Sequence, residues 1–150
     1  MGDNITKVIA KAEKQISDLL GEEIKIFADV TGGGDAKNNE IRYNVLGKNP
    51  DKNGITASFS LAQLPGCCGV CVSYHASVAI NIRRKGLGTL LCSIRKDIAR
   101  ALGYGCMLCT DVVKNEPQQR ILVKNGWKEV HTFRNPRTWN DVNIHVVNLY

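Results

Sequence analysis

The sequence predicts a mixed α/β fold built on one sheet, and three patterns support this. Apolar and polar residues alternate with a period of two in the first half of the chain, which indicates antiparallel strands with one wet face. An apolar strand, a glycine turn, an amphipathic helix and a second apolar strand then follow over residues 69–112, which is typical of a βαβ unit. Two last strand patterns predict a C-terminal hairpin. We expect one domain over residues 1–150, because the chain shows no repeat or low-complexity tract.

The composition limits the class of protein. Hydrophobic residues make up 43% and charged residues 23% of the chain, as in ordinary soluble domains. No apolar run approaches the roughly 20 residues of a membrane span, and the N-terminus lacks a signal-peptide pattern. We therefore expect a cytoplasmic protein with no membrane partner and with its six cysteines reduced. The net charge of +6 favours anionic ligands but does not choose among a nucleotide-like cofactor, a nucleic acid and an acidic protein.

The first expected element is a helix over residues 4–20, because apolar residues recur on one face at helical spacing. Asp3 or Asn4 is expected to cap its start, and Gly21 stands where a helix commonly ends. Three strands of an antiparallel meander are expected next, over residues 24–30, 41–45 and 55–61.

The first of the loops between these strands contains the triple glycine Gly32-Gly33-Gly34. A P-loop needs a Lys-Ser/Thr pair after its glycines, and none follows here. We therefore interpret the segment as a hairpin loop.

The βαβ unit occupies the middle of the chain. Residues 69–80 are longer and more apolar than the earlier strands, which suits a central position. A helical stripe from Leu87 to Leu102 follows and is closed by Gly103, and residues 105–112 form the second apolar strand. The two strands of such a unit are parallel.

The last third of the chain begins with a short helix. Asn115 is a good N-cap before Glu116 and Pro117, and Gly126 ends the helix. Two strands are expected to close the chain as a hairpin, over residues 127–132 and 142–149.

The turn inside the βαβ unit carries the main functional signal. Three cationic residues run into two glycines one residue apart, as Arg83-Arg84-Lys85-Gly86-Leu87-Gly88-Thr89. Glycine lets a backbone approach a ligand closely, and a helix start offers unpaired N–H groups to an anion. The turn therefore predicts a cradle for a phosphate or pyrophosphate, although an ordinary turn with a solvated basic patch fits the heptapeptide alone.

Two spacings around this turn resemble the GNAT superfamily of GCN5-related N-acetyltransferases. The first is the family's Gln/Arg-x-x-Gly-x-Gly/Ala signature, matched by Arg83 to Gly88, with Val78 five residues before it. The second is Asn115 followed eleven and twelve residues later by Gly126 and Trp127. The resemblance covers residues 69–127.

The resemblance implies a GNAT-like acyl-CoA N-acyltransferase fold, in which the two parallel strands splay apart where the cofactor inserts. It implies acetyl-CoA as donor, a primary amine as acceptor and no metal. The implied cofactor-binding residues are the strand end and turn, followed by the helix cap: Val78, Ala79, Ile80, Arg83, Arg84, Lys85, Gly86, Leu87, Gly88, Thr89 and Asn115.

The catalytic residues depart from the family pattern. Leu122 stands where many members carry the tyrosine that protonates the leaving thiolate. The strand before the turn offers Tyr74 and His75 as base candidates, and no carboxylate. Tyr74 shares the face of Val78 if the strand is regular, whereas a bulge would reverse this. Both residues stay candidates, with Thr110 and Asp111 as further proton relays.

The start of the chain also departs from the family, whose members usually begin with a strand followed by two helices that shape the acceptor site. Here one helix comes first. The acceptor therefore stays open among a small molecule, a protein lysine and an N-terminus, and a homodimer is left open too.

Three alternatives remain at this stage. Cys68, Cys71, Cys106 and Cys109 form two Cys-x-x-Cys pairs, which are typical of zinc sites, but their separation is too long and they lie in strand-like runs. A basic nucleic-acid-binding module fits the charge, but no RNP-like aromatic motif appears, so nucleic acid is not expected as the main ligand. The third alternative is a GNAT fold that binds CoA without catalysis.

Overall fold

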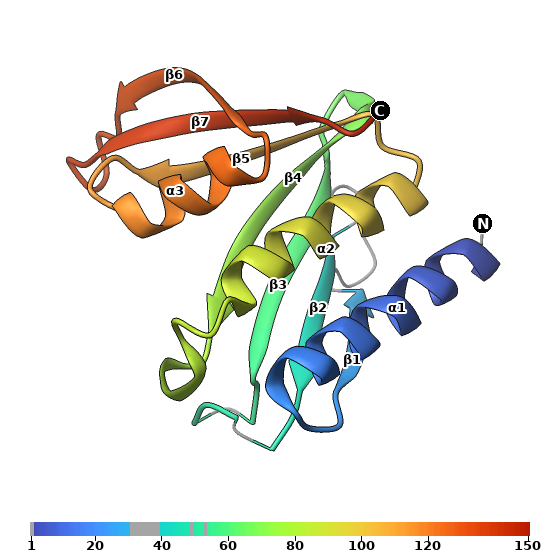
Figure 1. Ribbon diagram of the computed structural model, residues 1–150. Helices are drawn as coiled ribbons and strands as arrows, with labels where there is room; N and C mark the ends of the chain where they lie inside the picture. Colours follow the sequence, from blue (N-terminus) through green and yellow to red (C-terminus); the bar gives the residue numbers. More distant parts are fainter. Residues whose placement is uncertain (1, 31–39, 49, 53) are drawn as a thin grey trace.

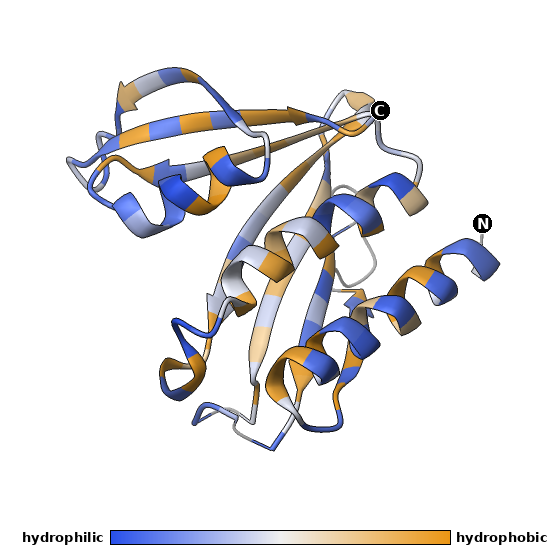
Figure 2. Ribbon diagram, viewed as in Figure 1, coloured by the Kyte–Doolittle hydropathy of each residue, from blue (hydrophilic) through white to orange (hydrophobic). Residues whose placement is uncertain are grey.

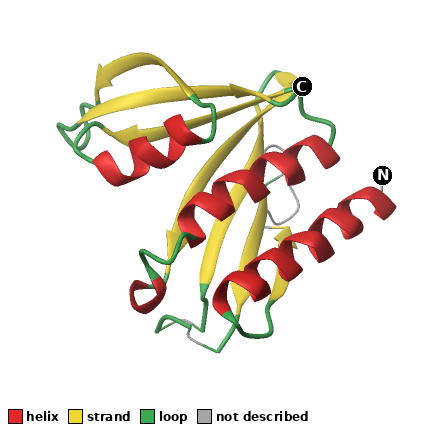
Figure 3. Cartoon of the chain, viewed as in Figure 1, coloured by secondary structure: helices red, strands yellow, loops and turns green. Residues whose placement is uncertain are grey.

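The computed structural model describes residues 2–30, 40–48, 50–52 and 54–150. Four strands follow the first helix in succession, and a βαβ unit, a short helix and two strands complete this part of the chain (Figures 1 and 3). Their order is α1 Gly2–Leu20, β1 Lys25–Val30, β2 Ile41–Leu46, β3 Ala57–Leu64, β4 Cys67–Val78, the 3-10 helix η1 Ile80–Ile82, α2 Leu87–Ala101, β5 Cys106–Val112, α3 Glu116–Lys124, β6 Lys128–Arg134 and β7 Asp141–Asn148.

The strands form one mixed sheet in the order β1-β2-β3-β4-β5-β7-β6. Strands β1 to β4 pair antiparallel as a meander, β4 and β5 pair parallel, and β6 and β7 form the last antiparallel pair. The predicted meander, βαβ unit and C-terminal hairpin are therefore confirmed, and the fold class is mixed α/β.

The parallel pair opens into a fork. Its register contains only three pairs, from Val70↔Cys106 to Val72↔Leu108. Beyond them β4 continues to Val78 and β5 to Val112, and Figure 1 shows the two strands diverging from the end near the C-terminus. On its β5 side, the β4 backbone after Val72 thus has no strand partner among the described residues.

A bulge interrupts β4 within the stretch that, in the described part of the chain, has no strand partner on its β5 side. Ser58 pairs with Ser77 but Ser60 pairs with Tyr74, so β4 carries one extra residue between these pairs. His75 adopts a φ of 52° there, a left-handed conformation that is rare for a residue with a side chain. The bulge reverses the alternation, so Val78 shares its face with Ser73, and Tyr74 lies on the other face.

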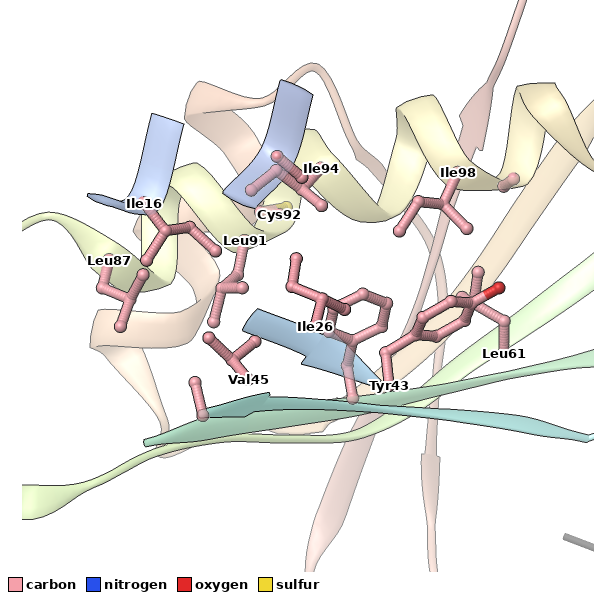
Figure 4. Close-up of a cluster of buried hydrophobic side chains, with 14 of the residues drawn as sticks. Ile16, Ile26, Tyr43, Val45, Leu61, Leu87, Leu91, Cys92, Ile94 and Ile98 are labelled. Carbon is pink, nitrogen blue, oxygen red and sulfur yellow. The ribbon is translucent and has the colours of Figure 1, made fainter. Parts of the chain in front are cut away.

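The core lies between one face of the sheet and the helices α1 and α2, which contact each other. Apolar residues recur between polar ones along both helices (Figure 2). In Figure 4, Ile16 of α1 and Leu91 of α2 point toward Ile26, Tyr43 and Val45 on the strands. Burial of this apolar area, at about 25 cal/mol per Å², fixes α2 over β3 and β4 and thereby places the turn before it.

Some predicted details differ. Asp3 and Asn4 lie inside α1 rather than at its cap, because the helix already begins at Gly2. Gly21 does follow the helix, with a φ of 69°. The triple-glycine loop lies outside the described residues, so its interpretation remains a prediction. None of the helices in the described segments is long and apolar enough to cross a membrane.

Candidate functional site

The turn before α2 presents backbone donors. Gly86 is the N-cap, with a φ of 87° and a ψ of −3° that suit glycine, and no described side chain caps the helix. The first helical hydrogen bond runs from the Leu90 N–H to the Gly86 carbonyl, at 3.1 Å. The N–H groups of residues 87–89 therefore have no acceptor within the helix and can bind an anion.

The turn opens onto a cavity of about 640 Å³ at the fork. Its walls come from the end of β4, the turn, one face of α2 and the start of α3. The lining residues are Ala76, Ser77, Val78, Ile82, Arg83, Arg84, Gly86, Gly88, Thr89, Leu91, Arg95, Asn115, Pro117, Gln118 and Ile121.

Seven of the eleven predicted cofactor residues line this cavity: Val78, Arg83, Arg84, Gly86, Gly88, Thr89 and Asn115. Arg83 is partly engaged, because its Nε donates to the Val78 carbonyl at 3.0 Å. Gly88 also allows α2 to approach α3, since a Cβ there would lie 3.2 Å from Ile121 Cδ1.

The other four predicted cofactor residues do not line it. Leu87 is buried in the core, and Lys85 and Ile80 are exposed. The Ala79 N–H donates to the Thr56 carbonyl at 2.9 Å, so it is not free to pair with a ligand.

Asn115 caps α3 and also lies at the cavity. Its Oδ1 accepts a hydrogen bond from the Gln118 N–H at 3.4 Å, which makes it the N-cap of α3. It also lines the cavity opposite the α2 turn. The start of α3 therefore faces the same space as the start of α2.

Tyr74 and His75 do not line the cavity. The bulge places Tyr74 on the sheet face opposite Val78, and its ring contacts that of His75 edge-on at 4.7 Å between centroids. Burial and a hydrogen bond with Glu40 raise the pKa of Tyr74 to about 12. The phenol is therefore protonated near neutral pH, so it can donate a proton but is not a base.

The two further proton-relay candidates, Asp111 and Thr110, differ in burial. Asp111 is buried and its Oδ1 lies 2.7 Å from His145 Nε2 on β7, whereas Thr110 is exposed. Neither lines the cavity. Leu122 is completely buried, so its side chain belongs to the core.

The cysteines do not assemble a metal site in the part of the chain described. No three of its His, Cys, Asp and Glu residues lie close enough together to hold a metal ion. Cys68 is exposed at the hairpin, while Cys71 and Cys109 are buried and Cys106 is intermediate. Burial, reinforced by Cys106, raises the pKa of the Cys71 thiol to about 12, which disfavours a thiolate ligand there.

Sequence reasoning missed several lining residues, of which Arg95 is the most informative. The sequence does carry a signal for this residue, because Arg95 follows Leu91 by four residues and precedes Ile98 by three. This spacing places it on the apolar face of the helix. A charged residue on the apolar stripe of a helix marks either a partnered core residue or a ligand site. The remaining missed residues come from the end of β4, η1, α2 and α3, whose approach to one cavity depends on tertiary packing.

The fold is similar to solved N-acetyltransferase structures. A protein proposed to be a phosphinothricin N-acetyltransferase matches with a TM-score of 0.61 and 18% identity, over 92% of this chain and 77% of that chain. An acetyltransferase of the GNAT family from Streptococcus pneumoniae gives 0.60 and 15%, over 73% and 66%. The spermidine N-acetyltransferase from Vibrio cholerae, in complex with CoA and spermine, gives 0.61 and 16%, over 73% and 66%. No family model and no curated protein matches the chain.

The chain therefore has the GNAT acetyltransferase fold. The resemblance that residues 69–127 predicted is confirmed at this level. The fork between β4 and β5 and the uncapped start of α2 lie within that stretch. A shared fold does not by itself carry an activity or an acceptor.

Proposed function

We propose that this protein is an N-acetyltransferase that moves the acetyl group of acetyl-CoA to a primary amine. The observation that carries the proposal is one cavity bounded by two kinds of free backbone group. The uncapped N–H groups of α2 lie at one side. The β4 backbone after Val72, which has no strand partner on its β5 side among the described residues, lies at the other. A pyrophosphate suits the first, and an extended amide-containing arm suits the second.

The residues of this chain fit the donor. Gly86 and Gly88 leave the helix start open, and a Cβ at Gly86 would meet no protein atom within 4 Å. Arg84 and Arg83 add positive charge at the same wall. Asn115 would contact the donor from α3. Acetyl-CoA supplies the acyl group as a thioester.

Transfer requires a bond from the amine nitrogen to the thioester carbonyl carbon and loss of the carbon–sulfur bond. The amine loses one proton, and the sulfur leaves as the CoA thiol. Positioning supplies much of the rate in such a reaction, and backbone N–H groups of β4 can polarise the thioester carbonyl. We keep His75 as the proposed base and Tyr74 as the proposed proton donor. Both lie at the bulge of β4 and neither lines the cavity, so in this mechanism protons reach them through solvent.

The acceptor stays open among a small amine, a protein lysine and an N-terminus. The Vibrio cholerae relative in the comparison carries spermine, which makes polyamines a sensible first class to assay. We propose the cytoplasm as the location of the protein. Its oligomeric state is to be measured on the sample used for the titration described next.

The experiment is calorimetric titration with CoA and acetyl-CoA, followed by an acetyl-transfer assay over a panel of polyamines, amino acids, lysine peptides and N-terminal peptides. We expect binding of both compounds and transfer to at least one amine class. Absence of CoA binding would overturn the proposal. Tight binding without transfer or thioester hydrolysis across the panel would instead favour a CoA-binding fold without catalysis, which the buried Leu122 makes worth testing.

A further inference from the structure

Arg95 occupies an unusual place for a charged side chain. It projects from the core-facing stripe of α2, and only 3% of its surface is exposed. Removing a guanidinium from water is costly unless hydrogen bonds and an opposite charge replace the lost solvent. The question is therefore whether the described residues supply these hydrogen bonds and this opposite charge, or whether a ligand does.

The described residues satisfy Arg95 only in part. Its guanidinium donates to Ser73 Oγ at 2.9 Å, while its Nε is buried without a partner in the described part of the chain. None of the ion pairs formed among the described residues includes Arg95. Its charge and most of its five donors are thus left for something else.

The buried carboxylate near Arg95 has its own partner. Burial raises the pKa of the Cys109 thiol to about 12, and the charges of Arg95 and Asp111 act on that thiol in opposite directions. Both charged groups therefore lie near Cys109. Asp111, however, contacts His145 at 2.7 Å and makes no ion pair with Arg95.

Arg95 also marks one end of the cavity. Its partner Ser73 directly follows Val72, the last β4 residue paired with β5, so the guanidinium lies at the closed end of the fork. The α2 turn lies beyond the other end of β4. Ser73 and Val78 lie opposite Leu61 and Ala57, four residue steps apart on β3, so with the bulge they are about 13 Å apart at roughly 3.3 Å per residue. An extended arm can span that length between the two ends.

We propose that Arg95 recognises a carboxylate at the far end of the acyl group, so that the preferred donor is a dicarboxylic acyl-CoA. This inference rests on the proposed function, since it assumes CoA in the α2 cradle. The planar guanidinium matches a carboxylate with two parallel hydrogen bonds and an opposite charge. Acetyl-CoA occupies the same cradle but leaves Arg95 unmatched.

The transfer chemistry is unchanged by the longer acyl group. The amine nitrogen bonds to the thioester carbonyl carbon, the carbon–sulfur bond breaks, and CoA leaves as the thiol after the amine loses a proton. The distal carboxylate takes no part and remains on the product amide. Arg95 is thus a specificity-determining residue that holds the acyl group.

Calorimetry on the wild-type protein tests the proposal without any variant. Succinyl-CoA carries the distal carboxylate, and butyryl-CoA has the same number of acyl carbons without it. We expect succinyl-CoA to bind at least about tenfold more tightly than butyryl-CoA or acetyl-CoA, the effect of one charge-assisted hydrogen-bonded contact. Arg95→Met should abolish this preference while leaving the affinity for CoA itself within about twofold.

Arg120→Met is the matched control, because Arg120 is an exposed arginine on α3 that does not line the cavity. It should keep the preference for succinyl-CoA. Equal binding of the three acyl compounds by the wild type, with CoA bound, would overturn the dicarboxylate proposal alone. No binding of CoA or any acyl-CoA would overturn the proposed function as well. If Arg95→Met does not fold, the wild-type comparison still decides.

Discussion

The anion cradle can be tested by placing one methyl group at Gly86. This glycine has a φ of +87° and lines the cavity, and a Cβ there would meet no protein atom within 4 Å. Gly86→Ala therefore costs about 1–2 kcal/mol of backbone strain without a clash in the protein. The methyl group would stand beside the N–H groups to which the proposed function assigns the pyrophosphate.

The chain offers a matched control at the other end of the same helix. Gly103 has a φ of +88°, its Cβ would also meet no atom within 4 Å, and it does not line the cavity. Gly103→Ala should therefore lower the free energy of unfolding by a similar amount, about 1–2 kcal/mol. The two variants thus separate strain from ligand contact.

The assay is calorimetric titration with CoA, with urea unfolding of both variants. Losing one charge-assisted hydrogen bond to the pyrophosphate, about 1.5–3 kcal/mol, should weaken binding to Gly86→Ala by about tenfold to a hundredfold. Gly103→Ala should bind CoA as the wild type does. Wild-type affinity in a folded Gly86→Ala would refute the placement, and equal losses in both variants would assign the effect to α2 as a whole.

Four further predictions follow from buried and strained groups. His75→Ala should lower kcat about a hundredfold, because it is the proposed base. Tyr74→Phe should lower kcat similarly but move no limb below pH 10, since burial and Glu40 raise the pKa of this phenol to about 12. Burial also raises the pKa of Tyr43 to about 12, so its contribution to stability is complete below pH 10 and is lost as pH rises to 12. Over that interval the wild type should lose about 2–3 kcal/mol more than Tyr43→Phe. Leu122→Ala should cost about 2–5 kcal/mol, because the side chain is completely buried.

Each of these has a direct check. Steady-state rates from pH 5 to 10 test the two catalytic variants, and profiles identical to wild type in both would remove them from the mechanism. Urea unfolding at pH 9 and pH 12 tests Tyr43→Phe. The buried cysteines titrate in both proteins and so cancel, which means that equal losses would exclude the Tyr43 phenol. A loss below 1 kcal/mol for Leu122→Ala would contradict its tight packing.

Local patterns predicted most of the fold. Period-two alternation placed the meander, helical spacing placed α1 and α2, and glycine turns marked their ends, because side-chain burial and backbone geometry act over a few neighbouring residues. The spacing from Val78 to Gly88 and from Asn115 to Trp127 likewise predicted which turn and which helix start face the cavity.

The sequence by itself determined the glycine turn before α2, since a glycine with positive φ before a helix is a local requirement. Only the tertiary structure decided what lies at the other end of the cavity. The bulge at His75 depends on pairing between β3 and β4, and it moved Tyr74 away from the face of Val78. Arg95 reaches the fork because α2 packs across β4, and its exposure and missing partner depend on residues far apart in the chain. The residues next to Arg95 in the chain do not specify such long-range contacts, which is why the glycine turn was predictable from the sequence and the surroundings of Arg95 were not.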